Sequence, residues 1–230
     1  MRLIALMIGG MLAGPMAPAA DAQEIHGQLA ITRSLTKQRV VLPSYAVRGV
    51  SPRKSETAST PVNEWERVVV YLEADKGLAA TASTRILATM DQTGERFQPE
   101  VLVVPAGSSV SFPNSDPIFH NVFSLSRTRE FDLGFYPEGK TRIVNFTKPG
   151  VVQVFCHLHP HMNATILVVP NAWHTRPADN GTFTLSKVPA GTYDVVVWHK
   201  SAGLFRKQVH VSASGVTNVS MEIPVGIETQ

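Results

Sequence analysis

Gly150-Val151-Val152-Gln153-Val154-Phe155 is followed directly by Cys156-His157-Leu158-His159-Pro160-His161-Met162, and these two runs decide how the chain is read. The first is a short apolar run of the kind that forms a buried strand. The second contains the only cysteine of the chain and three of its eight histidines. A thiolate, an imidazole and a thioether are soft ligands that suit copper. We therefore expect Cys156, His159 and Met162 to bind a metal on the loop that leaves this strand.

The fourth ligand must come from another part of the chain, and His120 in Pro117-Ile118-Phe119-His120-Asn121-Val122-Phe123 is the candidate. One thiolate, two imidazoles and a weak axial thioether form the ligand set of blue-copper electron-transfer sites. We expect one copper per chain, cycling between Cu(I) and Cu(II). His161 and His157 are alternative ligands, and a shift in loop register would put His161 in the axial position of Met162.

Cys156 is also compatible with roles that do not involve copper. It could be a buried structural thiol, or it could form a disulfide to a second chain. Zinc takes cysteine and histidine as well, but a structural zinc site needs four good donors and a thioether is a poor fourth. No carboxylate lies in the ligand loop to serve a catalytic zinc ion. Copper is therefore the favoured metal.

Composition restricts the class of protein. The chain has 230 residues, 43% of them hydrophobic and 17% charged, which is ordinary for a folded globular protein. Sixteen glycines and sixteen prolines favour many turns and an all-β fold. A net charge of +3, without a basic cluster interleaved with aromatic residues, argues against a nucleic-acid partner. No hydrolase, phosphate-binding or dinucleotide motif is present, so we expect no catalytic residues and no enzyme.

The N-terminus has the features of a signal peptide. Arg2 is followed by an apolar run from Leu3 to Leu12, and Ala20-Asp21-Ala22 resembles a cleavage site. The sequence thus predicts that residues 1–22 are removed after Ala22 and that the protein is exported to a periplasm. The apolar run is too short to span a bilayer, and no later run is long enough either, so we expect no membrane span.

The rest of the chain predicts strands throughout. Residues 24–31 alternate as strands do, residues 67–73 form an apolar strand-like run, and a dense series of short strands separated by turns runs from residue 86 to residue 169. Between the first two strands, residues 32–63 are basic, rich in Ser, Thr and Pro, and weakly periodic, which predicts an exposed loop. No segment has a sustained helical period.

Residues 85–170 resemble the cupredoxins, with a Cys-x-x-His-x-x-Met loop and a His-Asn-Val motif most like amicyanin and plastocyanin. The resemblance implies a Greek-key β-sandwich with the type 1 copper ligands His120, Cys156, His159 and Met162. It also implies that Asn121 ties the His120 loop to the Cys156 loop by hydrogen bonds. His159 would be the solvent-edge ligand, and a redox partner would dock on the apolar rim around it, formed by Pro117, Ile118, Phe119 and Pro160.

The tail has a different signature. Gly181-x-Phe183-x-Leu185, followed by Val188-Pro189-Ala190-Gly191-x-Tyr193, resembles the carboxypeptidase regulatory-like, or transthyretin-like, β-sandwich. In that family the first two strands match residues 25–31 and 67–73. The resemblance therefore implies a discontinuous sandwich of residues 23–84 and 171–230, with the cupredoxin domain inserted in it or joined to it.

Two functions follow from these features. The first is an exported mononuclear type 1 copper protein that transfers single electrons between redox partners. The alternative is a periplasmic copper carrier that binds and hands on the ion without redox turnover.

Overall fold

The computed structural model of this chain describes residues 23–32, 63–74, 84–213 and 215–223. In this part the regular structure is β-strand apart from one 3-10 turn, η1 (Glu64–Arg67), so the prediction of an all-β fold is confirmed. None of its helices is long and apolar enough to cross a membrane. The predicted signal peptide and nearly all of the predicted loop 32–63 lie outside the described residues.

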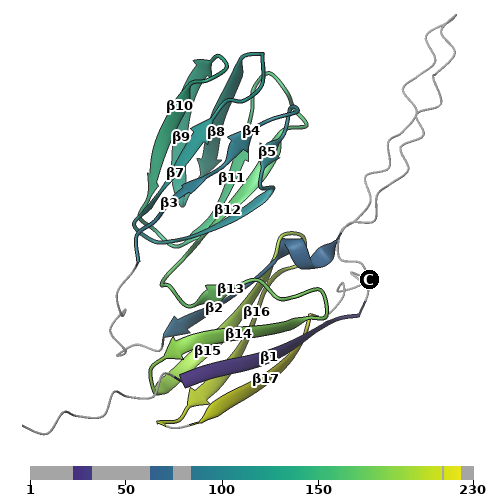
Figure 1. Cartoon of the computed structure of the whole chain (residues 1–230), viewed down its shortest axis with the longest axis vertical. Coiled ribbons are helices and arrows are strands. Elements are labelled where there is room, and N and C mark those ends of the chain that lie inside the picture. Colours follow the sequence, from purple (N-terminus) through teal and green to yellow (C-terminus); the bar gives the residue numbers. More distant parts are fainter. Residues whose placement is uncertain (1–22, 33–62, 75–83, 214, 224–230) are drawn as a thin grey trace, which may run out of the picture.

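Two sheets belong to the half of the molecule that contains the first and last strands (Figure 1). One is three-stranded, with the order β14 (Thr182–Val188), β1 (Gln23–Ile31) and β17 (Val216–Ile223). The other is four-stranded, with the order β13 (His174–Thr175), β2 (Val68–Ala74), β15 (Gly191–His199) and β16 (Gly203–Val211). Strand β1 runs antiparallel to β14 and parallel to β17.

The strands in between form the second half. A five-stranded sheet has the order β6 (Val101–Pro105), β12 (Asn163–Val169), β11 (Gly150–Phe155), β8 (His120–Ser126) and β9 (Arg129–Tyr136). A three-stranded sheet has the order β10 (Thr141–Phe146), β7 (Ser108–Pro113) and β3 (Leu87–Thr89). A short hairpin consists of β4 (Asp91–Gln92) and β5 (Phe97–Gln98). We refer to this half as the copper-loop sandwich and to the other as the outer sandwich.

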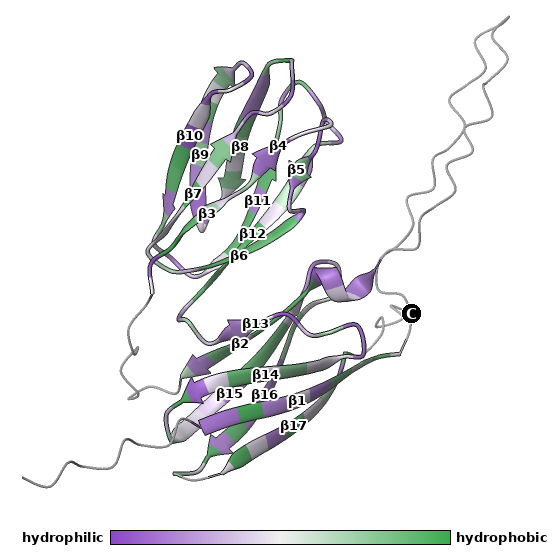
Figure 2. Ribbon diagram, viewed as in Figure 1, coloured by the Kyte–Doolittle hydropathy of each residue, from purple (hydrophilic) through white to green (hydrophobic). Residues whose placement is uncertain are grey.

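Strand pairing follows this division. Strands β1 and β2 pair with β13, β14, β15 and β17, all of which come after β12, whereas β3 to β12 pair among themselves. The chain therefore starts the outer sandwich, builds the copper-loop sandwich, and returns to complete the first. Along β14 apolar residues alternate with polar ones (Figure 2), as in a sheet with one buried face.

Three hydrophobic cores hold the sheets together. One fills each sandwich, and the third lies between them. In the third, Val69, Tyr71 and Trp198 of the four-stranded sheet pack with the five-stranded sheet, which contributes Leu167 and Val169. The central strands β2 and β12 are thus buried on both faces, which explains why both are nearly continuous apolar runs. The described sheets form four packed layers.

Candidate metal centre

The order of strands in the five-stranded sheet brings His120 close to Cys156. Strands β8 and β11 are antiparallel neighbours, with Phe123 opposite Phe155, so the end of β11 lies beside the start of β8. His120 is the first residue of β8, and Cys156 directly follows the last residue of β11. Two residues 36 positions apart in the sequence are therefore brought to the same end of one sheet.

The loop from β11 to β12 turns back on itself after the cysteine. The backbone N–H of Met162 donates to the carbonyl of His159 at 2.8 Å, which closes a turn over Pro160. This turn places the ring of His159 next to Cys156. The side chains of Cys156 and Met162 are both buried in the core of the copper-loop sandwich, with exposures of 4% and 1%.

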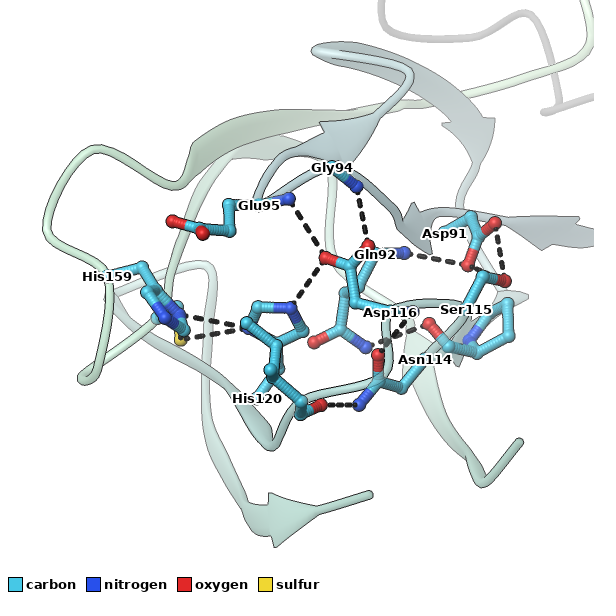
Figure 3. Close-up of polar contacts among 12 residues, drawn as sticks. Asp91, Gln92, Gly94, Glu95, Asn114, Ser115, Asp116, His120 and His159 are labelled. Atoms are coloured by element: carbon cyan, nitrogen blue, oxygen red, sulfur yellow. Dashed lines mark hydrogen bonds and ion pairs between the residues drawn. The ribbon is translucent and has the colours of Figure 1, made fainter. Parts of the chain in front are cut away.

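Three donor atoms converge here. His120 Nδ1 lies 3.0 Å from His159 Nδ1, and Cys156 Sγ lies 3.9 Å from the first nitrogen and 3.7 Å from the second. Figure 3 shows the rings of His120 and His159 directed toward each other, with the sulfur atom beside them. Among the described residues this is the one group of three or more His, Cys or acidic side chains whose geometry could hold a metal ion.

The dimensions of this triangle suit a metal. A triangle with these sides has its centre about 2.1 Å from every corner, within about 0.2 Å of ordinary metal–imidazole and metal–thiolate bond lengths. The fold therefore holds one thiol and two imidazoles at bonding distance from a common point. The donor set is the one that trigonal copper sites use.

A residue that the sequence reasoning missed orients His120. His120 Nε2 lies 2.8 Å from a carboxylate oxygen of Asp116, and both side chains are buried. An ionised carboxylate only accepts hydrogen bonds, so the proton of the imidazole belongs on Nε2. Nδ1 is then left with its lone pair facing Cys156 and His159. Carboxylate–histidine pairs of this kind fix the tautomer of metal ligands and raise their basicity.

Asp116 is itself held in a small backbone cradle. One of its carboxylate oxygens accepts the N–H of Gly94 at 2.6 Å, and the other accepts the N–H of Glu95 at 2.9 Å (Figure 3). Gly94 and Glu95 both have positive φ, 62° and 52°, and form the tip of the β4–β5 hairpin, where successive backbone N–H groups of a turn can bind an anion. Burial alone would raise the pKa of Asp116, but these N–H groups and His120 outweigh it and hold the pKa below its usual value.

Asn121 makes a different link from the one expected. Its side-chain amide donates to Asp132 Oδ1 at 2.7 Å and to the carbonyl of Gly134 at 3.2 Å, both on β9. Its buried oxygen has no hydrogen-bond partner among the described residues, so the expected bonds to the Cys156 loop are not formed there. The reason is the position of β9, which the sequence did not reveal and which supplies nearer partners.

The two alternative ligands lie elsewhere. The ring of His157 stacks on Phe123, with centroids 3.8 Å apart and planes 6° apart, and its Nε2 lies 3.7 Å from Asp132. The ring of His161 is about half exposed, and its Nε2 lies 3.4 Å from a carboxylate oxygen of Glu95. Neither belongs to the group of converging donors.

The outer edge of the centre is partly open. His159 is half-buried, whereas His120 is completely buried. Of the residues expected around it, Pro117, Pro160, Ile118 and Phe119 are exposed, the last two by 39% and 56%. Leu158, which the sequence reasoning did not single out, is 49% exposed in the same loop as His159. An apolar surface therefore surrounds the one donor ring that approaches solvent.

No protein-family model and no curated protein sequence matches the chain. Solved structures that align with part of it are copper proteins. The copper-containing nitrite reductase of Thermus scotoductus SA-01 is 27% identical over 37% of this chain and 23% of its own, with a TM-score of 0.35. The purple cupredoxin of Nitrosopumilus maritimus is 21% identical over 36% of this chain and 99% of its own, with a TM-score of 0.33. An oxidised variant of amicyanin is 19% identical over 36% and 81% of the two chains, with a TM-score of 0.34.

Proposed function

We propose that this chain is an exported electron-transfer protein that holds one copper ion with Cys156, His120, His159 and Met162. The observation that carries the proposal is the triangle of one sulfur and two Nδ1 atoms around a common point. Bound copper would supply a one-electron couple between Cu(II) and Cu(I). The chain's own residues keep the donors fixed, so that few atoms need to move when the electron is transferred.

Met162 is preferred to His161 as the axial ligand. The Met162 side chain is buried in the same core as Cys156, whereas the His161 ring is half exposed and directed to Glu95. A weak axial thioether leaves the trigonal donors dominant and suits both valences of copper. His161 would have to break its contact with Glu95 to take this place.

The burial of the centre favours electron transfer over copper delivery. Cys156 and His120 are 4% and 0% exposed, so a competing thiolate has little access to the donors. An electron needs no such access, because the half-buried ring of His159 reaches the surface among Ile118, Phe119 and Pro160. We propose this apolar rim as the docking site of the redox partner.

We further propose that the copper-loop sandwich, residues 85–170, is a cupredoxin domain inserted between the two parts of the outer sandwich. The pairing of β1 and β2 with strands that follow β12 supports this division. The likeness of the outer sandwich to transthyretin-like domains stays a prediction, as does cleavage of a signal peptide after Ala22.

Titration of the metal-free chain with Cu(II), followed by visible absorption and electron paramagnetic resonance, tests the site. We expect an intense thiolate-to-copper band with a narrow hyperfine splitting that saturates at one equivalent. Cys156→Ser should abolish the band. A weak spectrum of tetragonal Cu(II) in the unmodified chain would contradict the proposal, because it would mean that histidines bind copper without the thiolate.

Two further measurements address the axial ligand and the carrier alternative. Met162→Leu should keep the band and change the reduction potential, whereas Met90→Leu, in the same core, should change neither. An unchanged potential in Met162→Leu would exclude a thioether ligand. Rapid loss of Cu(I) to a competing small thiol would favour the copper carrier instead.

A further inference from the structure

A pocket of about 480 Å³ lies beside the metal loop, where the two sandwiches meet. Its walls come from three segments that are far apart in sequence. Arg67 ends η1 of the outer sandwich, Arg96 and Gln98 belong to the β4–β5 hairpin, and His161 and Met162 belong to the metal loop. A pocket of this volume is large enough for a small-molecule ligand.

The charge of the pocket is positive in balance. Its one acidic lining residue, Glu100, accepts two hydrogen bonds from Arg67 at 3.0 and 3.1 Å and one from Lys200 at 2.5 Å. Two cations from different segments thus lie beside this one carboxylate. These cations and burial act in opposite directions on Glu100, and the cations hold its pKa below the usual value.

Arg96 adds a second positive charge to the lining of the pocket. It is exposed, and within the described ranges of the chain no hydrogen bond or ion pair to its guanidinium is formed. The neighbouring acid Glu95 lies close to the ring of His161 instead, with 3.4 Å between the carboxylate and Nε2. The guanidinium of Arg96 is therefore available to a ligand in this pocket.

We propose that this pocket binds a small oxyanion, a carboxylate or a phosphate. A guanidinium binds such groups through two parallel N–H···O bonds, which gives both affinity and orientation. Arg96 supplies this fork, and the side-chain amide of Gln98 supplies a further N–H donor. Arg67 and Lys200 lie beside the pocket as further cations, and their positive potential favours the approach of an anion.

The position of Met162 connects this pocket to the metal centre, and this step rests on the proposed function. Met162 lines the pocket and is also the proposed axial ligand. An anion bound next to the thioether favours the more positive valence of the copper, Cu(II), over Cu(I). Occupancy of the pocket should therefore lower the reduction potential.

Binding is tested first on the full metal-free chain, so that the outcome does not depend on copper. Inorganic phosphate and acetate are titrated separately, at constant ionic strength maintained with sodium chloride, and followed by nuclear magnetic resonance. We expect saturable shifts at Arg96 and Gln98 with at least one anion, and the tighter of the two identifies the class. Arg96→Gln should weaken binding by about tenfold or more. The matched control is Arg127→Gln, an exposed arginine in the β8–β9 turn, which should bind as the unmodified chain does.

Shifts that do not saturate, or affinities that Arg96→Gln leaves unchanged, would overturn the oxyanion site. The copper-loaded chain then tests the link to the metal, because the tighter anion should lower the potential and Arg96→Gln should remove this effect. An unchanged potential at saturating anion would overturn the link alone. Saturable, Arg96-dependent binding in a chain that never develops a thiolate-to-copper band would support the pocket and refute the proposed function.

Discussion

The molecule contains two fully buried histidines, one in each sandwich, and each has Nε2 on a carboxylate. His120 lies 2.8 Å from Asp116, and His199 lies 3.0 Å from Glu64. They differ at the second nitrogen. Nδ1 of His120 faces Cys156 and His159, whereas Nδ1 of His199 accepts the backbone N–H groups of Ser201 and Ala202, each at 3.1 Å.

The difference shows that a buried histidine–carboxylate pair can either orient a metal ligand or connect parts of the fold. At His199 both nitrogens are satisfied within the fold, so the ring fixes η1 to the β15–β16 turn and has nothing left to offer a ligand. At His120 the carboxylate satisfies one nitrogen and leaves the other facing a thiol and a second imidazole. The partner of Nδ1, rather than burial or the carboxylate, therefore distinguishes a metal-binding histidine from a structural one.

Replacing each of the two histidines by alanine should give the largest difference in copper binding. His120→Ala deletes one of three converging donors, so we expect complete loss of the thiolate-to-copper band on Cu(II) titration. His199→Ala should keep the band at full intensity. A band that survives in His120→Ala, or disappears in a folded His199→Ala chain, would show that the two roles have been assigned wrongly.

The free energy of unfolding should depend strongly on His199, although copper binding does not. His199→Ala removes a buried ring that accepts two partly buried N–H groups and contacts Glu64, which should lower the free energy of unfolding by about 2–4 kcal/mol. Urea denaturation of the metal-free chain measures this change. His210→Ala, on an exposed position of β16, is the control and should stay within about 0.5 kcal/mol of the unmodified chain. Equal effects of the two substitutions would refute a structural role for His199.

Replacing the carboxylate of Asp116, rather than the ring of His120, should have a smaller effect on copper binding. Asp116→Asn cannot keep the same acceptor geometry for His120, Gly94 and Glu95, so copper affinity should fall about 10- to 100-fold while the band remains recognisable. Competition with a chelator of known affinity measures it. Asp91→Asn is the matched control, because Asp91 lies on the hairpin that holds Asp116 but accepts hydrogen bonds from Ser115 and Gln92 and does not contact His120. Equal affinity in Asp116→Asn would show that His120 is oriented by packing alone.

The structural role of His199 also predicts how the free energy of unfolding depends on pH. Burial lowers the pKa of His199 below its usual 6.5, and this outweighs the opposing effect of Glu64. The unfolded chain then binds a proton near pH 6.5 that the folded chain does not, so stability is complete above that pH and falls as the pH decreases. Each unit of pKa depression corresponds to about 1.4 kcal/mol. His199→Gln should therefore flatten the pH dependence of urea unfolding between about pH 5 and 7, and an equally steep dependence would contradict this account.

Local patterns made the metal loop predictable. Cys156, His159 and Met162 lie within one loop, and the apolar run before them predicts the strand that carries it. His120 could be inferred only as a partner from elsewhere, because its approach depends on β8 lying beside β11. The positions of most strands were also predictable, since alternation and turn residues mark them.

What was missed depends on contacts between distant segments. Asp116 could not be recognised from the sequence, because its role requires a hairpin whose Gly94 and Glu95 both have positive φ. Strand β9 was not predicted, although Phe131 and Leu133 alternate with polar residues along it and pack against the core of the copper-loop sandwich. The bonds expected of Asn121 came from the family resemblance, and β9 supplies Asp132 and Gly134 as its partners instead.

The third core, between the two sandwiches, has a consequence for how such a chain can evolve. Val69, Tyr71 and Trp198 on one sheet fit against Leu167 and Val169 on the other, so neither surface can change its volume alone without a cavity or a clash. Accepted substitutions on one side should therefore be compensated on the other. Exchange of the copper-loop sandwich for that of another protein should therefore disturb this core, unless the facing residues of the outer sandwich change with it.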